Sequence, residues 1–162
     1  MRIGILSDTH NRNLTTGLAL AQLWERGIST VLHCGDIEGP ETVALFRGLT
    51  SHFVFGNCDW DRQAIREAVA EIGATLHEPY ANLELEGRRI AVVHSDNKTL
   101  FRGLENSKRF DFLFYGHTHK AEEHRSGPTR VINPGALHRA NPKTFVVLDL
   151  ATQKIETVVV EP

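Results

Sequence analysis

The sequence predicts a layered α/β fold in which two β-sheets pack face to face and helices cover their outer faces. Short apolar strands alternate with amphipathic, helix-sized segments through the first 73 residues, whereas the later part of the chain is mostly strand-like. No linker, low-complexity tract or fixed-period repeat interrupts the 162 residues, a length suited to one domain. We therefore expect residues 1–162 to form a single domain.

The first part of the chain repeats a unit of strand, polar loop and helix. Each strand is a short apolar run, and each helix carries apolar residues at helical spacing. Gly27 and Gly73 are expected to end two of the helices, and Pro40 to begin the other. The expected strands and helices, in order, are 3–6, 14–24, 30–33, 40–46, 53–55 and 61–72. Such alternation favours parallel strands, whose ligands gather beyond the carboxyl ends of the strands.

The pattern changes after Gly73. Alternating apolar and polar residues at 83–86 lead through a hairpin turn at Gly87–Arg88 into the apolar run 89–93. One helix is expected at 98–108, and the remaining strands at 110–115, 121–125, 129–132, 144–150 and 154–160. We expect this part of the chain to be mostly antiparallel.

The composition excludes several classes of partner. Hydrophobic residues at 41%, charged residues at 23% and a net charge of -2 give no general attraction to nucleic acid or membranes. The chain has no basic, aromatic-rich stripe, so we expect no long nucleic-acid partner. No apolar stretch approaches the ~20 residues of a membrane span, so we expect no membrane partner.

Two features bear on location and assembly. Cys34 and Cys58 are too few for a disulfide framework and do not form a Cys-x-x-Cys pair, which favours a reducing compartment. The sequence runs from Met1 directly into strand-like residues, so we expect a cytoplasmic protein. The late strands offer an edge at which a homo-oligomer could form.

Polar residues of metal-binding type follow the ends of the predicted strands. Any one of them could be a capping or turn residue, and for Asp36 or Asn57 alone that reading is the better one. Their joint placement favours a metal site, because adjacent strand ends would bring carboxylates, an amide oxygen and imidazoles to one edge. The seven residues are Asp8, His10, Asp36, Asn57, His94, His117 and His119.

Seven such groups are too many for one four-coordinate zinc ion. They suit two ions that share a bridging carboxylate, about 3.5–4 Å apart as in two-metal hydrolytic sites. The other histidines lack this context. We give His33 and His138 a smaller chance of lying near the site, and expect the remaining three to be surface or core residues: His52, His77 and His124.

These residues resemble the signature of the calcineurin-like metallophosphoesterases, and most closely that of their short, YfcE-like phosphodiesterase members. The resemblance extends from Asp8 to about Asn133–Pro134–Gly135. It rests on five ordered blocks, which are Asp8–x–His10, Gly35–Asp36, Gly56–Asn57–x–Asp59, His94 and Gly116–His117–x–His119. The resemblance implies a four-layer αββα sandwich with two mixed sheets.

The resemblance also implies a dinuclear site. One metal would be bound by Asp8, His10, Asp36 and His119, and the other by Asp36, Asn57, His94 and His117. The expected cofactors are two divalent ions, first of all manganese, with iron, zinc, nickel, cobalt and magnesium as alternatives. The implied reaction is hydrolysis of a small phosphodiester, or of a phosphomonoester, by a hydroxide that bridges the two metals.

Three residues have expected roles in catalysis or substrate binding. Asn57 is expected both to bind metal and to donate a hydrogen bond to the substrate phosphate. Asp59 is a candidate catalytic residue that orients a ligand or a water, with helix capping as an equal alternative. Arg12 is a candidate substrate contact, although a solvated arginine is the commoner case.

The sequence departs from the family pattern at one position that matters for mechanism. Many members carry a histidine after the loop asparagine, where it is thought to protonate the leaving oxygen, but this chain has Cys58, which leaves the general acid unknown. Loss of activity is therefore one alternative, in which the protein is a phosphoesterase-fold scaffold for protein–protein interaction, like the retromer small subunit. In such relatives metal ligands are eroded, whereas here each ligand position of the pattern is present.

Overall fold

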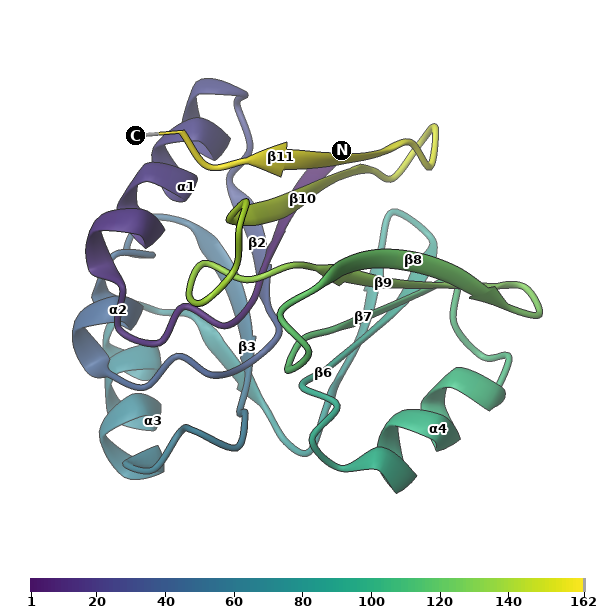
Figure 1. The fold of residues 1–162 in the computed structure, drawn as a ribbon, viewed down its shortest axis with the longest axis horizontal. Helices are drawn as coiled ribbons and strands as arrows, with labels where there is room; N and C mark the ends of the chain where they lie inside the picture. The colour runs from purple at the N-terminus through teal and green to yellow at the C-terminus, as the bar shows by residue number, and fades with distance from the viewer. Residues whose placement is uncertain (162) are drawn as a thin grey trace.

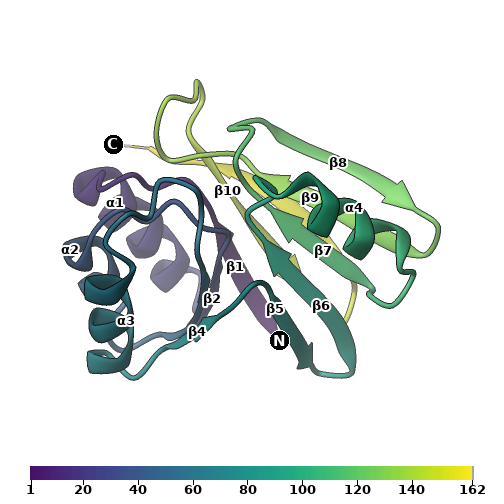
Figure 2. The same ribbon diagram turned by 90° about the horizontal axis from the view of Figure 1, so that it is seen from below.

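The computed structural model describes residues 1–161 and confirms two mixed β-sheets with helices on their outer faces (Figures 1 and 2). The first sheet has the strand order β11 (Ile155–Val159), β10 (Thr144–Asp149), β1 (Arg2–Leu6), β2 (Thr30–His33), β3 (Thr50–Val54) and β4 (Thr75–His77). The second has the order β5 (Ala81–Leu85), β6 (Arg88–Val93), β7 (Phe112–Tyr115), β9 (Thr129–Pro134) and β8 (Ala121–Ser126). The helices are α1 (Asn13–Glu25), α2 (Pro40–Ala44), α3 (Arg62–Glu71) and α4 (Lys98–Asn106). Among residues 1–161, no helix combines the length and apolar character needed to cross a bilayer.

The alternation of side chains along the strands produces the four layers. Along β1, Ile3 and Ile5 point into the core between the two sheets, whereas Leu6 faces the core beneath α1, α2 and α3. A third core joins the second sheet to α4 through Leu113 and Leu104. Figure 2 shows α1, α2 and α3 on one side of the paired sheets and α4 on the other. The four-layer αββα arrangement therefore follows from the period of two in the strands.

Parallel strands in both sheets set the position of the candidate site. In the first sheet β1, β2 and β3 are parallel, and in the second sheet β6, β7 and β9 are parallel. The loops that follow these strands meet at one edge, where the Asp8 N–H donates to the Gly35 carbonyl and the Gly116 N–H donates to the His94 carbonyl. The predicted polar strand ends therefore lie together.

Three details differ from the sequence prediction. Strand β4 was missed because three residues at a sheet edge carry little periodic signal. Helix α2 ends at Ala44, and the chain continues as turns to Gly48. The later part of the chain is antiparallel at β5, β8, β10 and β11, but β6, β7 and β9 pair in parallel because α4 and β8 provide the crossovers.

Candidate metal centre

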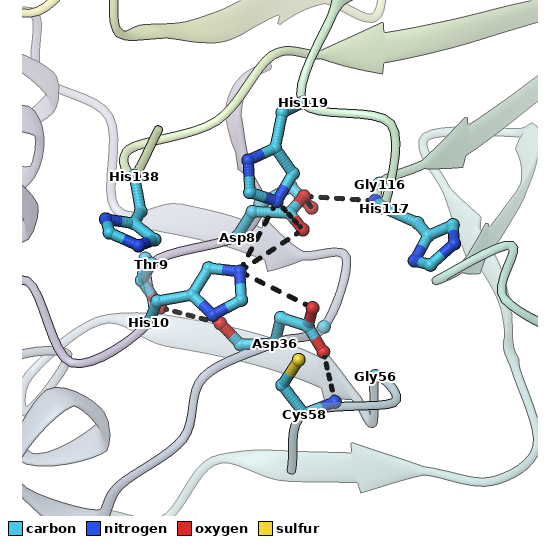
Figure 3. Close-up of polar contacts among 12 residues, drawn as sticks. Asp8, Thr9, His10, Asp36, Gly56, Cys58, Gly116, His117, His119 and His138 are labelled. Atoms are coloured by element: carbon cyan, nitrogen blue, oxygen red, sulfur yellow. Dashed lines mark hydrogen bonds and ion pairs between the residues drawn. The ribbon is translucent and has the colours of Figure 1, made fainter. Parts of the chain in front are cut away.

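The first group of ligand-type side chains comes from the loops after β1 and β7. The Nε2 atom of His119 lies 3.0 Å from Asp8 Oδ1, and the Nε2 atoms of His10 and His119 lie 3.4 Å apart (Figure 3). Asp8 Oδ1 is buried and accepts no hydrogen bond from residues 1–161. A carboxylate oxygen of this kind, beside two imidazole nitrogens, is a typical ligand for a divalent cation.

The second group is centred on Asp36. Asp36 Oδ2 lies 3.1 Å from His94 Nε2 and 3.5 Å from His10 Nε2, so this carboxylate faces both halves of the site. Asn57 Oδ1 lies 3.1 Å from the same nitrogen of His94. The Asp36 carboxylate thus lies between the His10 and His94 side chains.

Hydrogen bonds at Nδ1 fix the ring orientation of two histidines. The Nδ1 atom of His10 lies 2.6 Å from Glu38 Oε1, and the Nδ1 atom of His94 lies 2.8 Å from the Cys34 carbonyl oxygen. In each case an N–H on Nδ1 donates to oxygen, which leaves Nε2 free to bind a cation. These two roles were not predicted from the sequence. The position of Glu38, two residues after Asp36 in the same loop, is the one signal that could have indicated them.

Asp59 acts on the loops rather than on the cleft. Its Oδ1 accepts hydrogen bonds from the backbone N–H groups of Ile37 (2.8 Å) and Glu38 (2.7 Å), and its Oδ2 from those of Asp36 (3.1 Å) and Gly56 (2.7 Å). The capping alternative is wrong, because Asp61 caps α3 by accepting from the Ala64 N–H. Asp59 therefore joins the loop that carries Asp36 to the loop that carries Asn57.

Several candidate ligands have a left-handed backbone. The φ angles of Asp8, His10, Asp36, His117 and His119 are 53°, 43°, 57°, 72° and 59°. Non-glycine residues rarely adopt such angles, and they do so mainly where surrounding structure holds them for a function. Here the constraint comes from hydrogen bonds between loops, such as the one from the His117 N–H to Asp8 Oδ2 (3.1 Å).

The electrostatics keep the carboxylates ionised beside positively polarised imidazoles. Burial would raise the pKa of Asp8, but ion pairs with His10 and His119 hold it well below its usual range. Burial would lower the pKa of His10, but Asp8 and Glu38 raise it to about 9. Burial would also lower the pKa of His94, but the Asp36 carboxylate raises it above its usual value. Metal binding to these nitrogens therefore has to displace protons.

His117 is not drawn into either group. Its side chain is exposed and its ring points away from Asp8 and Asp36 (Figure 3). It lies edge-on to the His94 ring, with centroids 5.2 Å apart, and it lines the same cleft as His10 and His119. Its predicted role as a ligand therefore requires its side chain to turn.

His138 lines the cleft, unlike the other four histidines outside the predicted ligand set. Its Nδ1 accepts a hydrogen bond from Arg12 Nε (3.0 Å), and its ring packs on that of His10 with centroids 5.0 Å apart. Arg12, His138 and Arg139 line the cleft, which has a volume of about 440 Å³. His138 follows β9, and the parallel pairing of β9 with β7, missed in the sequence analysis, brings it to the same edge.

The remaining histidines do not line the cleft, although His33 lies behind it, against the loops that carry Asp8 and Asp36. His33 is fully buried, with its ring nitrogens near Thr9 Oγ1 and the Gly35 N–H, and burial lowers its pKa to about 3. His52 and His77 contact each other, and His124 pairs with Glu105.

Cys58 lies beside Asp36. Its backbone N–H donates to Asp36 Oδ1 (2.8 Å), and its Sγ accepts from Asn57 Nδ2 (3.4 Å). Burial and then the Asp36 carboxylate raise the pKa of the thiol to about 11. The thiol is therefore neutral at pH 7.

The donor set fits divalent metal ions. Among residues 1–161, three overlapping groups have ligand atoms within 4.8 Å of one another: Asp8–His10–His119, His10–Asp36–Cys58 and Asp8–Asp36–His94. Asp8, whose buried Oδ1 accepts no hydrogen bond from residues 1–161, belongs to two of them. Carboxylate and imidazole ligands suit first-row divalent metals.

Comparison with known proteins identifies a family and two kinds of relative. A model of the calcineurin-like phosphoesterase superfamily domain matches residues 1–153. A phosphodiesterase of Methanocaldococcus jannaschii is 25% identical over 166 residues, which cover 99% of this chain and 100% of that protein. A solved structure described as a novel archaeal phosphodiesterase matches with a TM-score of 0.90 and 25% identity, over 98% of this chain and 99% of its own.

Two further solved structures share the fold at lower identity. YfcE, a phosphoesterase from E. coli, matches with a TM-score of 0.68 and 20% identity, over 99% of this chain and 100% of its own. Vps29 from Entamoeba histolytica, solved in complex with zinc, matches with a TM-score of 0.71 and 21% identity over the same shares. At these identities the likeness concerns the fold alone.

Proposed function

Because the chain belongs to the calcineurin-like phosphoesterase superfamily, as its motifs predicted, we propose that it hydrolyses a small phosphodiester at a dinuclear metal site. The observation that carries this proposal is the position of Asp36, whose carboxylate faces His10 on one side and His94 on the other. A carboxylate between two sets of nitrogen and oxygen donors is the arrangement that two-metal hydrolases use.

Each metal would have its own set of ligands. One ion would be held by Asp8, His10, Asp36 and His119, whose ligand atoms converge around Asp8 Oδ1 and His10 Nε2. The other would be held by Asp36, Asn57, His94 and His117, once the His117 ring turns toward Asp36. Manganese is the first candidate, and iron, zinc, nickel, cobalt and magnesium accept the same ligand types.

When bound, two divalent ions supply a water of lowered pKa and positive charge to offset the charge that develops on phosphoryl oxygens. The side chains of this protein position the reactants. Asn57 Nδ2, which contacts only the weak acceptor Cys58 Sγ at 3.4 Å, is placed to donate to a phosphoryl oxygen instead. Arg12, fixed by His138, offers its outer guanidinium nitrogens to the substrate. Asp59 holds the loops of Asp36 and Asn57 in place relative to each other through backbone hydrogen bonds, without touching the substrate.

The alternative is a scaffold that binds partner proteins. Three aromatic residues, Phe55, Trp60 and Phe101, do not form a shared exposed patch: Trp60 is 86% exposed, but Phe55 is buried and Phe101 packs on Tyr115 with ring centroids 4.8 Å apart. One exposed tryptophan is a small contact surface. The intact set of ligand positions favours the enzyme.

The test is turnover of bis(p-nitrophenyl) phosphate by protein freed of metal with a chelator. We expect activity to return on addition of manganese and to be lost again with excess chelator. No turnover with any first-row divalent ion, in a protein that still binds the ion by calorimetry, would favour the scaffold over the enzyme.

A further inference from the structure

A second cavity, which we call the side pocket, adjoins the candidate metal centre. It has a volume of about 390 Å³ and lies between the start of α3 and the start of α4. The lining residues used below are Phe55, Arg62, Val93, His94, Asp96 and Leu100. A volume of this size is in the range that encloses small organic groups.

One contact joins a residue of the side pocket to a residue of the metal cleft. His94 lines the side pocket, Asn57 lines the metal cleft, and Asn57 Oδ1 lies 3.1 Å from His94 Nε2. Both residues follow strands that end at the same edge of the molecule, β3 and β6. A ligand whose phosphoryl group contacts Asn57 therefore has one substituent within reach of the side pocket.

The walls of the side pocket combine an apolar surface with polar side chains. Of its charged groups, Glu78 is paired with Arg66, which leaves Arg62 and Asp96 without an ion-pair partner among residues 1–161. Phe55, Val93 and Leu100 supply the apolar surface. The Arg62 guanidinium lies 4.8 Å from the centre of the Phe55 ring and has no ion-pair partner among residues 1–161, whereas the neighbouring Arg66 is paired with Glu78 at 2.9 Å. The Asp96 carboxylate has no hydrogen bond or ion pair within the same residues.

We propose that the side pocket binds the uncharged, hydroxylated alcohol portion of a phosphodiester whose phosphoryl group lies in the metal cleft. The inference rests on the proposed phosphodiesterase function and narrows its substrate class. A hydroxyl group can accept from Arg62 and donate to Asp96, so one such substituent satisfies both unpartnered groups. A second phosphate would meet Asp96, and a cationic head group would meet Arg62. A phosphomonoester has no second organic substituent to fill the pocket.

The test compares two diesters with the same leaving group, p-nitrophenyl thymidine 5′-phosphate and methyl p-nitrophenyl phosphate. In both, a water oxygen forms the new bond to phosphorus as the bond to p-nitrophenolate breaks. We expect kcat/KM to be at least about tenfold higher for the thymidine ester, because its hydroxylated substituent gains about 1.4 kcal/mol in the side pocket. Equal values would overturn the proposal.

The variant Arg62→Ala locates this preference. It removes the exposed donor of the side pocket, and the ratio of the two kcat/KM values is expected to fall about tenfold, mainly through KM. Arg47→Ala is the matched control, because Arg47 is an exposed arginine that pairs with Glu71 away from both cavities. A ratio in Arg62→Ala equal to that in Arg47→Ala would refute the assignment.

Binding without turnover separates this inference from the proposed function. Thymidine 5′-(methyl phosphate) is titrated into isotopically labelled protein, and the amide signals of Arg62, Asp96 and Asn97 are followed by nuclear magnetic resonance. Shifts at these amides without hydrolysis of either ester would support binding in the side pocket and reject the phosphodiesterase function. Hydrolysis without these shifts would support the phosphodiesterase and reject the side pocket as a binding site.

Discussion

Asp36→Asn is expected to abolish metal-dependent hydrolysis of bis(p-nitrophenyl) phosphate while leaving the protein folded. Asparagine keeps the size of the side chain and an oxygen that can accept from the Cys58 N–H, now 2.8 Å from Oδ1. It removes the negative charge between His10 and His94, the group that would join the two metals. The loss of several kcal/mol of transition-state stabilisation corresponds to a fall in kcat on the order of 10³-fold.

The control for this variant is Asp111→Asn, at the opposite end of the second sheet. Asp111 lies 3.6 Å from Arg89 on the surface and lines neither the metal cleft nor the side pocket. Its activity should equal that of the unmodified protein. Circular dichroism and thermal unfolding show whether each variant is folded. A folded Asp36→Asn protein with full activity would remove Asp36 from the mechanism.

Gly56→Ala is expected to damage both the fold and the metal centre. A Cβ atom at this position would lie 2.1 Å from Asp36 Oδ1 and 2.5 Å from the Asp36 backbone nitrogen, so Asp36 must move. The same movement strains the hydrogen bond from the Gly56 N–H to Asp59 Oδ2. We expect the free energy of unfolding to fall by about 1–3 kcal/mol, as for overpacked cores, and metal affinity to fall about 10- to 100-fold.

Gly17→Ala provides the contrast within the same chain. A Cβ at Gly17 meets no atom within 4 Å, and the residue lies inside α1, where alanine is favoured over glycine by about 1 kcal/mol. Urea denaturation should therefore show a gain in stability for Gly17→Ala and a loss for Gly56→Ala. Calorimetric titration with manganese should show weaker binding only for Gly56→Ala. Equal metal affinity in both variants would mean that the Asp36 loop does not define the site.

The strand ends carried most of the information that the sequence offers about this molecule. Asp8, Asp36 and His94 each follow a short apolar run, and their ligand atoms lie together at one edge of the molecule as predicted. This inference works because strand period and polar termini are local properties. The position of His138 could not be read in this way, because it depends on the pairing of β9 with β7, which is not a local property.

The orientation of several loop side chains could not be predicted from the sequence. The contact of Glu38 with His10 and the four backbone hydrogen bonds of Asp59 arise from left-handed loop conformations that no local pattern predicts. The same holds for His117, which follows its strand as predicted but whose exposed ring points away from Asp36, the carboxylate that it was expected to join. Spacing alone places a residue on a loop, and the contacts between loops decide where its side chain points.

Anomalous diffraction from crystals grown with manganese locates the bound ions. We expect two manganese peaks, with the Asp36 carboxylate bound to both ions, Asp8, His10 and His119 on one ion, and Asn57, His94 and His117 on the other. A single peak at saturating manganese, or two ions that do not share Asp36, would refute the dinuclear site.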